Sequence, residues 1–148
     1  MKVIMKPGKT NDVLATIAIG APYYNAWAEY ALPTWRPYCE RHDLGLIAFD
    51  TDLISKDSKI WKKPTWQKLL IGQTLQRELP AARNVCFLDT DILVNYTAPN
   101  VFEAYDPTTI GLVSVHHNLP YPRDQALRRM AFLRNRYYDH SYPLDSAL

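Results

Sequence analysis

The sequence lacks the features that mark several common classes of protein. Only two cysteines occur, Cys39 in a helical pattern and Cys86 in an apolar run, which argues against a disulfide framework and favours a reducing compartment. No apolar stretch is long enough for a signal peptide or a membrane span. The formal net charge of +2 is too small to indicate nucleic-acid binding. These absences leave a globular protein that we expect to be cytoplasmic.

The residues that are present suffice for one folded domain. The chain has 148 residues, of which 47% are hydrophobic and 22% are charged, so it can bury a core of its own. No repeat or low-complexity stretch interrupts it. We expect residues 1–12 to be an N-terminal extension and residues 13–148 to form a single domain.

Apolar, β-rich runs alternate with helical patterns along the sequence. Strands are predicted at Val13–Ile19, Gly45–Phe49, Val85–Leu88 and Ile110–Val115. Helices are predicted at Asn25–His42, Pro64–Leu79, Asn100–Tyr105 and Asp124–Tyr137, with a polar loop at Thr51–Lys63. Pro33 and Pro37 should kink or divide the first helix. The alternation predicts an α/β fold with a mostly parallel central sheet and flanking helices.

Two acidic residues, Asp89 and Asp91, close the third predicted strand. Carboxylates this close together at the rim of a core repel each other and are costly to desolvate. A divalent cation removes that cost, because Mg²⁺ and Mn²⁺ prefer hard oxygen ligands. Open α/β sheets also bind their ligands at the carboxyl ends of strands, where this pair is predicted to lie. The alternative is a plain turn, since Asp is common at strand-to-turn junctions.

These elements follow one another in an order that resembles a known family. The order is a helix with Tyr38-Cys39-Glu40-Arg41-His42, a strand ended by Asp50, a helix with Trp66-Gln67-Lys68-Leu69, and the strand Phe87-Leu88-Asp89-Thr90-Asp91. It is similar to the amino-terminal half of GT-A glycosyltransferases, in particular the glycogenin-like and galactosyltransferase-like families. The resemblance covers roughly residues 13–115 and implies a Rossmann-like GT-A domain that binds a nucleotide-sugar.

The resemblance also implies an activity, that of a metal-dependent glycosyltransferase. In these families both motif aspartates face the site, which would place Mn²⁺ or Mg²⁺ on Asp89 and Asp91. The metal bridges the donor diphosphate and assists departure of the nucleoside diphosphate. The expected partners are a nucleotide-sugar donor, for which we expect a UDP-sugar, and a saccharide or other hydroxyl acceptor.

Six further residues are candidates for donor binding. They are Ala18, Gly20, Tyr23, Asp50, Lys68 and Thr90. Tyr23, or its neighbour Tyr24, either stacks on the base or packs beneath the kinked helix. Asp50 either accepts hydrogen bonds from the base or ribose, or caps a turn. Lys68 either points at donor phosphate or sugar, or lies in solvent, and Thr90 either touches ribose or is a spacer.

The carboxyl-terminal part of the chain leaves the metal site incomplete. In the resembled enzymes a third metal ligand, usually a His, lies beyond the motif, where this sequence has His116, His117 and Asp139-His140. Adjacent strand residues face opposite ways, so at most one of His116 and His117 reaches the site. We expect either that the chain is part of a longer enzyme or that water, donor phosphate or a second subunit completes the site.

Two other functions stay open. A haloacid-dehalogenase-type phosphatase also uses two aspartates one residue apart, as nucleophile and general acid. That family has Gly-Thr where Ile92-Leu93 stands here, and its motif normally opens the chain. A non-catalytic binding module that keeps the transferase fold is the other alternative, with its Arg-rich helix at Arg123–Arg136 docked on an anionic partner or membrane. Otherwise that helix is a solvated amphipathic one.

Overall fold

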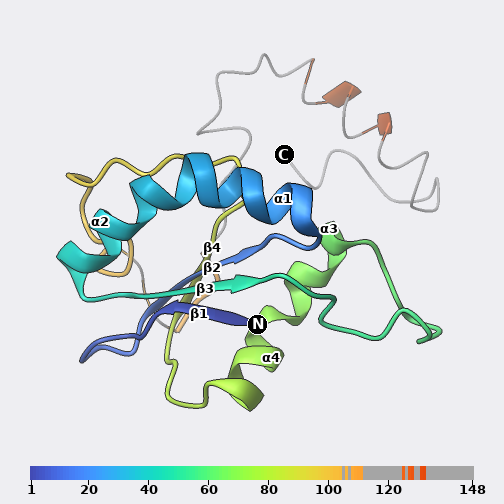
Figure 1. Ribbon diagram of the computed structural model, residues 1–148, viewed down its shortest axis with the longest axis horizontal. Coiled ribbons are helices and arrows are strands. Elements are labelled where there is room, and N and C mark those ends of the chain that lie inside the picture. The colour runs from blue at the N-terminus through green and yellow to red at the C-terminus, as the bar shows by residue number, and fades with distance from the viewer. Residues whose placement is uncertain (105, 107, 112–124, 126, 129–130, 133–148) are drawn as a thin grey trace. The chain divides into compact units, whose positions relative to one another are not determined.

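The computed structural model describes residues 1–104, 106, 108–111, 125, 127–128 and 131–132. The chain forms two compact units, Met1–Thr108 and Thr109–Leu148. Almost all of the described residues belong to the first unit, which contains the sheet and the candidate site (Figure 1). Its architecture is mixed α/β, with a four-stranded mixed sheet flanked by helices.

Three strands of this sheet are parallel and match the predicted ones. The sheet has the order β1-β3-β2-β4. β2 (Val13–Ile17) and β3 (Gly45–Phe49) pair in register along their whole length. β4 (Val85–Phe87) pairs with β2 on the opposite side from β3. The predicted mostly parallel sheet is therefore confirmed for this part of the chain.

The fourth strand, β1 (Lys2–Met5), lies where the sequence predicts an N-terminal extension. It pairs antiparallel with β3 at the edge of the sheet, which corrects that prediction. The strand is short, its apolar run is only Val3–Met5, and Lys2 and Val3 are exposed, as is typical of an edge strand.

One helical run connects β2 to β3 and contains a π-helical segment. It consists of α1 (Ala21–Ala26), the π-helical η1 (Trp27–Ala31) and α2 (Leu32–His42). At the end of η1 the Leu32 N–H donates to the Trp27 carbonyl, and the next residue, Pro33, has no N–H to donate. The run is therefore divided beside a proline, as predicted, whereas Pro37 lies inside α2.

A second helical run connects β3 to β4 and is also divided. It consists of α3 (Pro64–Gln67), the 3-10 turn η2 (Lys68–Leu70) and α4 (Ile71–Glu78). The sequence predicts one helix over Pro64–Leu79, so its start is confirmed and its continuity is not. The preceding stretch, Thr51–Lys63, contains no helix or strand, as predicted.

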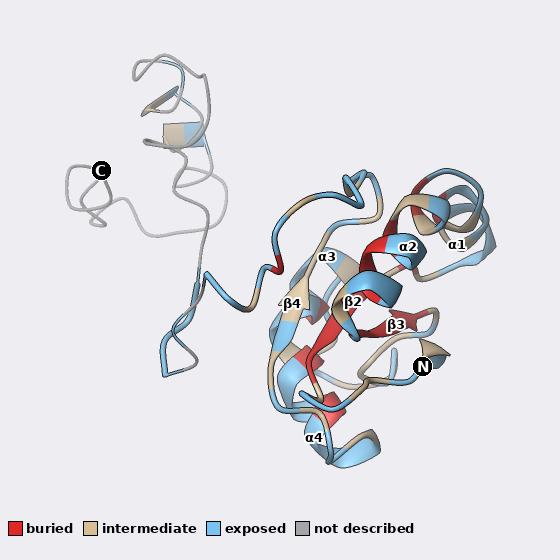
Figure 2. Cartoon of the chain, turned by 90° about the vertical axis from the view of Figure 1, so that its left-hand side faces the viewer, coloured by how far each residue is buried: buried red, intermediate tan, exposed pale blue. Residues whose placement is uncertain are grey.

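The two helical runs cover opposite faces of the sheet (Figure 1). On one face Leu14 and Leu46 pack in a cluster with Trp35 of α2. On the other face the intervening strand residues, such as Ile47, pack in a cluster with Ile71 of α4. Figure 2 shows β2 and β3 as the buried centre of this arrangement. Burial on both faces is the reason why these strands read as continuous apolar runs.

The order of the parallel strands reverses at β2. The first helical run leads from β2 to β3 on one side, and the second leads from β3 across to β4 on the other. The parallel strands β2 and β4 are neighbours, so their carboxyl ends lie next to each other. From β2 the chain continues to the strand on one side of it, β3, and then crosses back to the strand on its other side, β4. Open α/β sheets bind ligands in the crevice that forms at such a reversal.

The predictions for the residues after β4 have mixed outcomes. The helix predicted at Asn100–Tyr105 is wrong for its described part, because residues 101–104 form a turn. The Asn100 side chain accepts from the Phe102 N–H at 3.1 Å, a local bond that competes with helix formation. The predicted strand Ile110–Val115 is described only at residues 110 and 111, which are not in a strand, and otherwise lies outside the described residues. Residues 125, 127, 128, 131 and 132 are helical, in agreement with the helix predicted there.

Across the described residues, we find no helix with the length and apolar character needed to cross a membrane.

Candidate functional site

The aspartates of the motif follow β4 directly, at the carboxyl edge of the sheet. Asp89 and Asp91 are exposed and Thr90 is half-buried, and the Ile92 N–H donates to the Asp89 carbonyl at 3.2 Å to form a turn. Within the described part of the chain, neither carboxylate takes part in a hydrogen bond or an ion pair. The turn therefore forms without a capping bond from either side chain, and both carboxylates are available to a ligand.

Buried side chains fix both ends of this motif. Thr16 of β2 is fully buried, and its hydroxyl donates to the Leu88 carbonyl at 2.8 Å, immediately before Asp89. Trp35 of α2 is also fully buried, and its indole N–H donates to the Ile92 carbonyl at 2.8 Å, immediately after Asp91. The backbone on both sides of residues 89–91 is therefore held by buried side chains of β2 and α2.

Side chains of α2 bind the backbone of residues 94–101, the segment that follows the motif. The side chains involved share one face of the helix, and their contacts are Thr34 to Val94 N–H at 3.1 Å, Tyr38 to Pro99 O and Val101 N–H at 2.9 Å each, Arg41 to Tyr96 O at 3.2 Å, and His42 to Ala98 O at 2.9 Å. A groove of about 360 Å³ lies beside this segment, with mostly apolar lining that includes Leu14, Cys86 and Leu88. None of these contacts is recognisable from sequence periodicity, because the bonded groups of the segment are backbone atoms.

The two thiols are not candidates for chemistry. Cys39 is buried, and its burial, together with the nearby Glu40 charge, raises the pKa of its thiol to about 12. Burial likewise raises the pKa of the Cys86 thiol. A thiol needs to ionise to act as a nucleophile, so both residues serve as small packing groups, as the sequence indicates.

The candidate residues after β2 divide into backbone and surface positions. Ala18 is buried, and its N–H donates to the Phe49 carbonyl at 2.8 Å, which extends the ladder beyond β2. Gly20 has a φ of 93°, a conformation that favours glycine, at the start of α1. Tyr23 is 67% exposed. Tyr24 is half-buried and packs on Trp27, with ring centroids 5.8 Å apart.

Asp50 forms ion pairs with the N-terminal end of the chain, where the unpredicted strand β1 begins. Its carboxylate lies 3.3 Å from the Lys2 ammonium and 3.6 Å from the amino terminus, both of which belong to the β1 end of the chain. Partial burial raises the pKa of Asp50, but the hydrogen bond from Lys2, its own backbone N–H and the two positive charges outweigh that effect and lower the pKa below its usual value. Asp50 is thus a charged anchor for β1 at the carboxyl end of β3.

Lys68 lies beside the motif strand. It is exposed on η2, and its ammonium is 5.5 Å from the ring centroid of Phe87 on β4. Phe87 is the last residue of β4 and precedes Asp89 by two residues. Lys68 therefore lies beside the end of the strand that leads into the motif.

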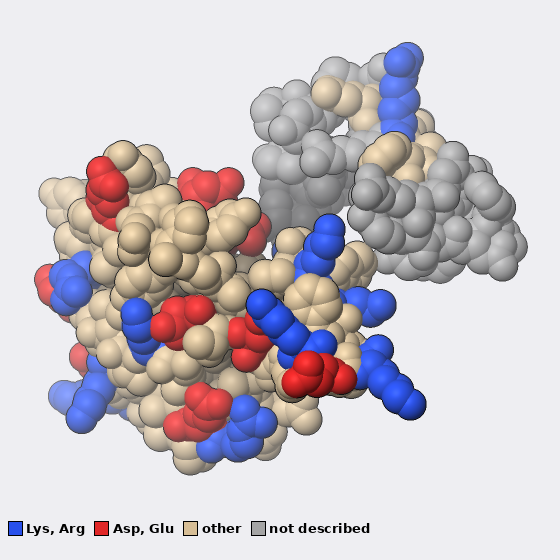
Figure 3. All heavy atoms as spheres, turned by 45° about the vertical axis from the view of Figure 1, so that its right-hand side comes forward, with Lys and Arg blue, Asp and Glu red and all other residues tan. Residues whose placement is uncertain are grey.

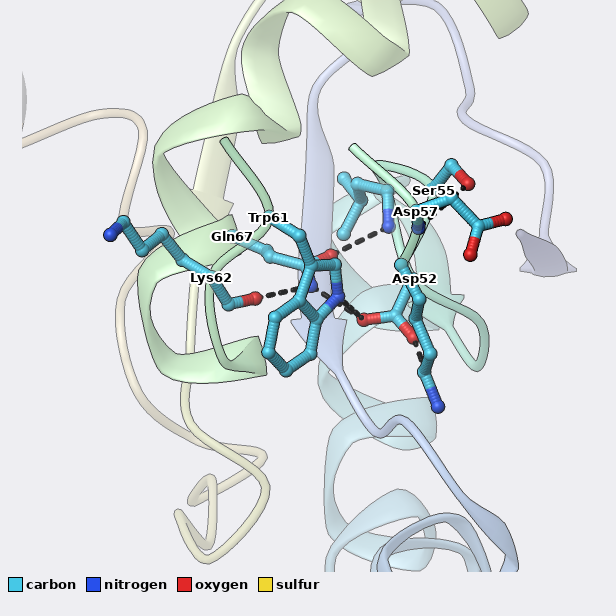
Figure 4. Close-up of polar contacts among 8 residues, drawn as sticks. Asp52, Ser55, Asp57, Trp61, Lys62 and Gln67 are labelled. Atoms are coloured by element: carbon cyan, nitrogen blue, oxygen red, sulfur yellow. Dashed lines mark hydrogen bonds and ion pairs between the residues drawn. The ribbon is translucent and has the colours of Figure 1, made fainter. Parts of the chain in front are cut away.

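A buried glutamine next to Lys68 organises the loop between β3 and α3 (Figure 4). Gln67 is 1% exposed, and its amide donates to Asp52 at 2.5 Å and to the Lys62 carbonyl at 2.8 Å, while its carbonyl accepts from the Leu53 N–H at 2.7 Å. The Trp61 indole also donates to Asp52, at 3.1 Å. Sequence reasoning missed this network, although Gln67 lies four residues before the buried Ile71, where a polar residue on an apolar helix stripe is the signal to look for.

The remaining candidate ligands, His116, His117, Asp139 and His140, lie outside the described residues. In the described ranges, no three or more His, Cys, Asp or Glu side chains gather in a way that would hold a metal ion.

No protein family model, no curated protein and no solved structure matches the chain. Its function is therefore argued from the site alone.

Proposed function

We propose that the protein is a metal-dependent glycosyltransferase with a Rossmann-like GT-A nucleotide-sugar-binding domain, and that its donor is a UDP-sugar. One observation carries the proposal: two exposed carboxylates without bonding partners, Asp89 and Asp91, stand where the strand order reverses, within the described part of the chain. A ligand-binding crevice is expected at this position in an open α/β sheet.

The residues present suit a divalent cation. Mg²⁺ and Mn²⁺ are commonly bound through one or two carboxylates while substrate phosphates and water supply the other ligands, so the pair Asp89 and Asp91 is a sufficient protein contribution. When bound, the metal supplies positive charge to the donor diphosphate and so assists its departure from the sugar. Thr16 and Trp35 hold the aspartates in place through the backbone on either side of them.

Neighbouring residues suit the other parts of the donor. Lys68 presents an ammonium beside Phe87, two residues before Asp89, where it can bind phosphate oxygens. Gly20 allows a close approach of ligand to the backbone at the end of β2, and the exposed ring of Tyr23 follows it as a stacking surface for the base. A saccharide or another hydroxyl compound is the proposed acceptor.

Calorimetric titration of the whole chain with UDP tests the proposal. We expect measurable binding with Mn²⁺ or Mg²⁺ present and at least tenfold weaker binding with a chelator, because the two carboxylates repel the diphosphate when no cation lies between them. Equal affinity under both conditions would contradict the proposal. Hydrolysis of an aryl phosphate without nucleotide would instead support the phosphatase alternative, in which an aspartate attacks phosphorus directly.

A further inference from the structure

The loop before α3 and the turns that follow it form an exposed surface of mixed character. Ile60 and Leu69 are 71% and 78% exposed, and Trp66 is 44% exposed. The same stretch carries exposed lysines, namely Lys56, Lys59, Lys62, Lys63 and Lys68. Its one acidic residue is Asp57. We refer to residues 56–69 as the basic–apolar surface.

This surface is not a loosely attached loop. The connection between β3 and α3, residues 50–63, contains no helix or strand. A connection as long as this is uncommon in a compact domain and usually has a function or is disordered. Here the buried Gln67 binds the backbone of Leu53 and Lys62, and Trp61 is tied to Asp52. In Figure 4 the Lys62 side chain points away from this network, so the polar bonds lie inside and the cation lies outside. The chain therefore orders the loop while it leaves apolar and basic side chains in water.

We propose that the basic–apolar surface docks on an anionic membrane surface. Lysines near an anionic leaflet are attracted to its headgroups, and Ile, Leu and Trp side chains gain by entering the boundary between headgroups and acyl chains. A nucleic acid or an acidic polymer would neutralise the lysines but leave Ile60 and Leu69 in water. Figure 3 shows Lys and Arg side chains interspersed with Asp and Glu side chains over one face of the molecule.

The loop that leads to this surface leaves the end of β3, at the carboxyl edge of the sheet. Docking there would bring the same edge that carries Asp89 and Asp91 toward the lipid. The inference concerns attachment only and does not depend on the proposed transfer activity, so vesicle binding and metal-dependent UDP binding can succeed or fail separately.

Vesicle flotation with the full chain tests the attachment. We expect the protein to float with vesicles that contain phosphatidylglycerol, to stay unbound with pure phosphatidylcholine, and to be released as salt is raised. Lys62→Gln combined with Lys63→Gln should weaken binding about 30-fold. The same change at two exposed lysines of another part of the chain, Lys6→Gln with Lys9→Gln, is the matched control and should have a much smaller effect.

The apolar contribution is tested separately. Ile60→Ser with Leu69→Ser should weaken vesicle binding by at least tenfold, whereas Tyr30→Ser, at a 66% exposed residue of η1, should not. All these side chains are exposed, so a thermal melt should confirm that each variant is folded. The proposal would be overturned if the protein failed to float, or if it bound neutral vesicles equally well. It would also be overturned if the protein bound soluble polyglutamate as tightly as vesicles and the Ile60 and Leu69 changes had no effect.

Discussion

Two regions at the carboxyl edge of the same sheet treat their carboxylates in opposite ways. In the loop after β3, Asp52 accepts from Gln67 at 2.5 Å and from Trp61 at 3.1 Å, and the Lys56 ammonium lies 3.8 Å away. In the turn after β4, Asp89 and Asp91 have no such partner among the described residues. Asp52 thus stabilises its loop through hydrogen bonds and an ion pair. Asp89 and Asp91 meet no such donor among the described residues, so their carboxylates are available to a ligand.

The largest expected effect on stability is at Gln67, in the loop where Asp52 has hydrogen-bond partners. Gln67→Leu should lower the free energy of unfolding by about 2–3 kcal/mol, since it leaves the partly buried Leu53 N–H and Lys62 carbonyl without their bonds. Urea denaturation measures this loss. The matched control is Gln73→Leu at an exposed position of α4, which should change stability by less than about 0.5 kcal/mol. Similar values for the two variants would mean that Gln67 does not hold the loop.

A smaller effect is expected at Thr16, which supports the motif without contacting a ligand. Thr16→Val removes the hydroxyl that binds the Leu88 carbonyl and should lower the free energy of unfolding by about 1 kcal/mol. If this bond positions the aspartates, the variant should also bind Mn²⁺–UDP several-fold more weakly, and Thr16→Ser, which restores the hydroxyl, should recover most of that affinity.

Tyr38→Phe is the control for this position. It removes bonds to Pro99 and Val101 farther along the same segment, so it should cost a similar free energy of unfolding and leave Mn²⁺–UDP affinity unchanged. The electron paramagnetic resonance spectrum of bound Mn²⁺ should then change in Thr16→Val and not in Tyr38→Phe. Equal effects of both variants on binding would show that Thr16 contributes stability alone.

The same comparison explains which parts could be predicted from the sequence. β2 and β3 are apolar runs buried on both faces, β4 is a shorter apolar run that is only partly buried, and the aspartates follow β4. Both the mostly parallel sheet and the position of the motif are therefore visible in the residue order. β1 is a short edge strand with only three apolar residues, Val3–Met5, and its exposed Lys2 pairs with Asp50 at the end of the neighbouring strand β3. Its detection would have required knowing its partner.

The supporting polar contacts could not be predicted for a related reason. The hydroxyl of Thr16 and the carbonyl of Leu88 are 72 residues apart in the chain, and the Trp35 indole and the Ile92 carbonyl are 57 apart. A threonine in a strand and a tryptophan in a helix have ordinary propensities, and only the fold brings them to the motif. The division of the second helix at η2 is also invisible, since the residues Lys68–Leu70 favour an α-helix as much as their neighbours do.

The smallest expected effect on stability is at Asp91, and it is the most informative about function. Asp91→Asn keeps the shape of the side chain and removes one negative charge. Because the Asp91 carboxylate makes no capping bond within the described structure, the change should alter the free energy of unfolding by no more than about 0.5 kcal/mol, and in the metal-free protein it should raise it slightly as repulsion with Asp89 is relieved. Mn²⁺-dependent UDP affinity should fall by at least tenfold, together with any hydrolysis of a UDP-sugar. Glu29→Gln, which removes one charge from an exposed residue of η1, is the control and should change neither quantity. If Asp91 were a turn-capping residue, its substitution would instead cost about 1 kcal/mol and leave binding intact. A thermal melt and a calorimetric titration of these two variants thus decide whether the carboxylates without partners exist for a metal or for the turn.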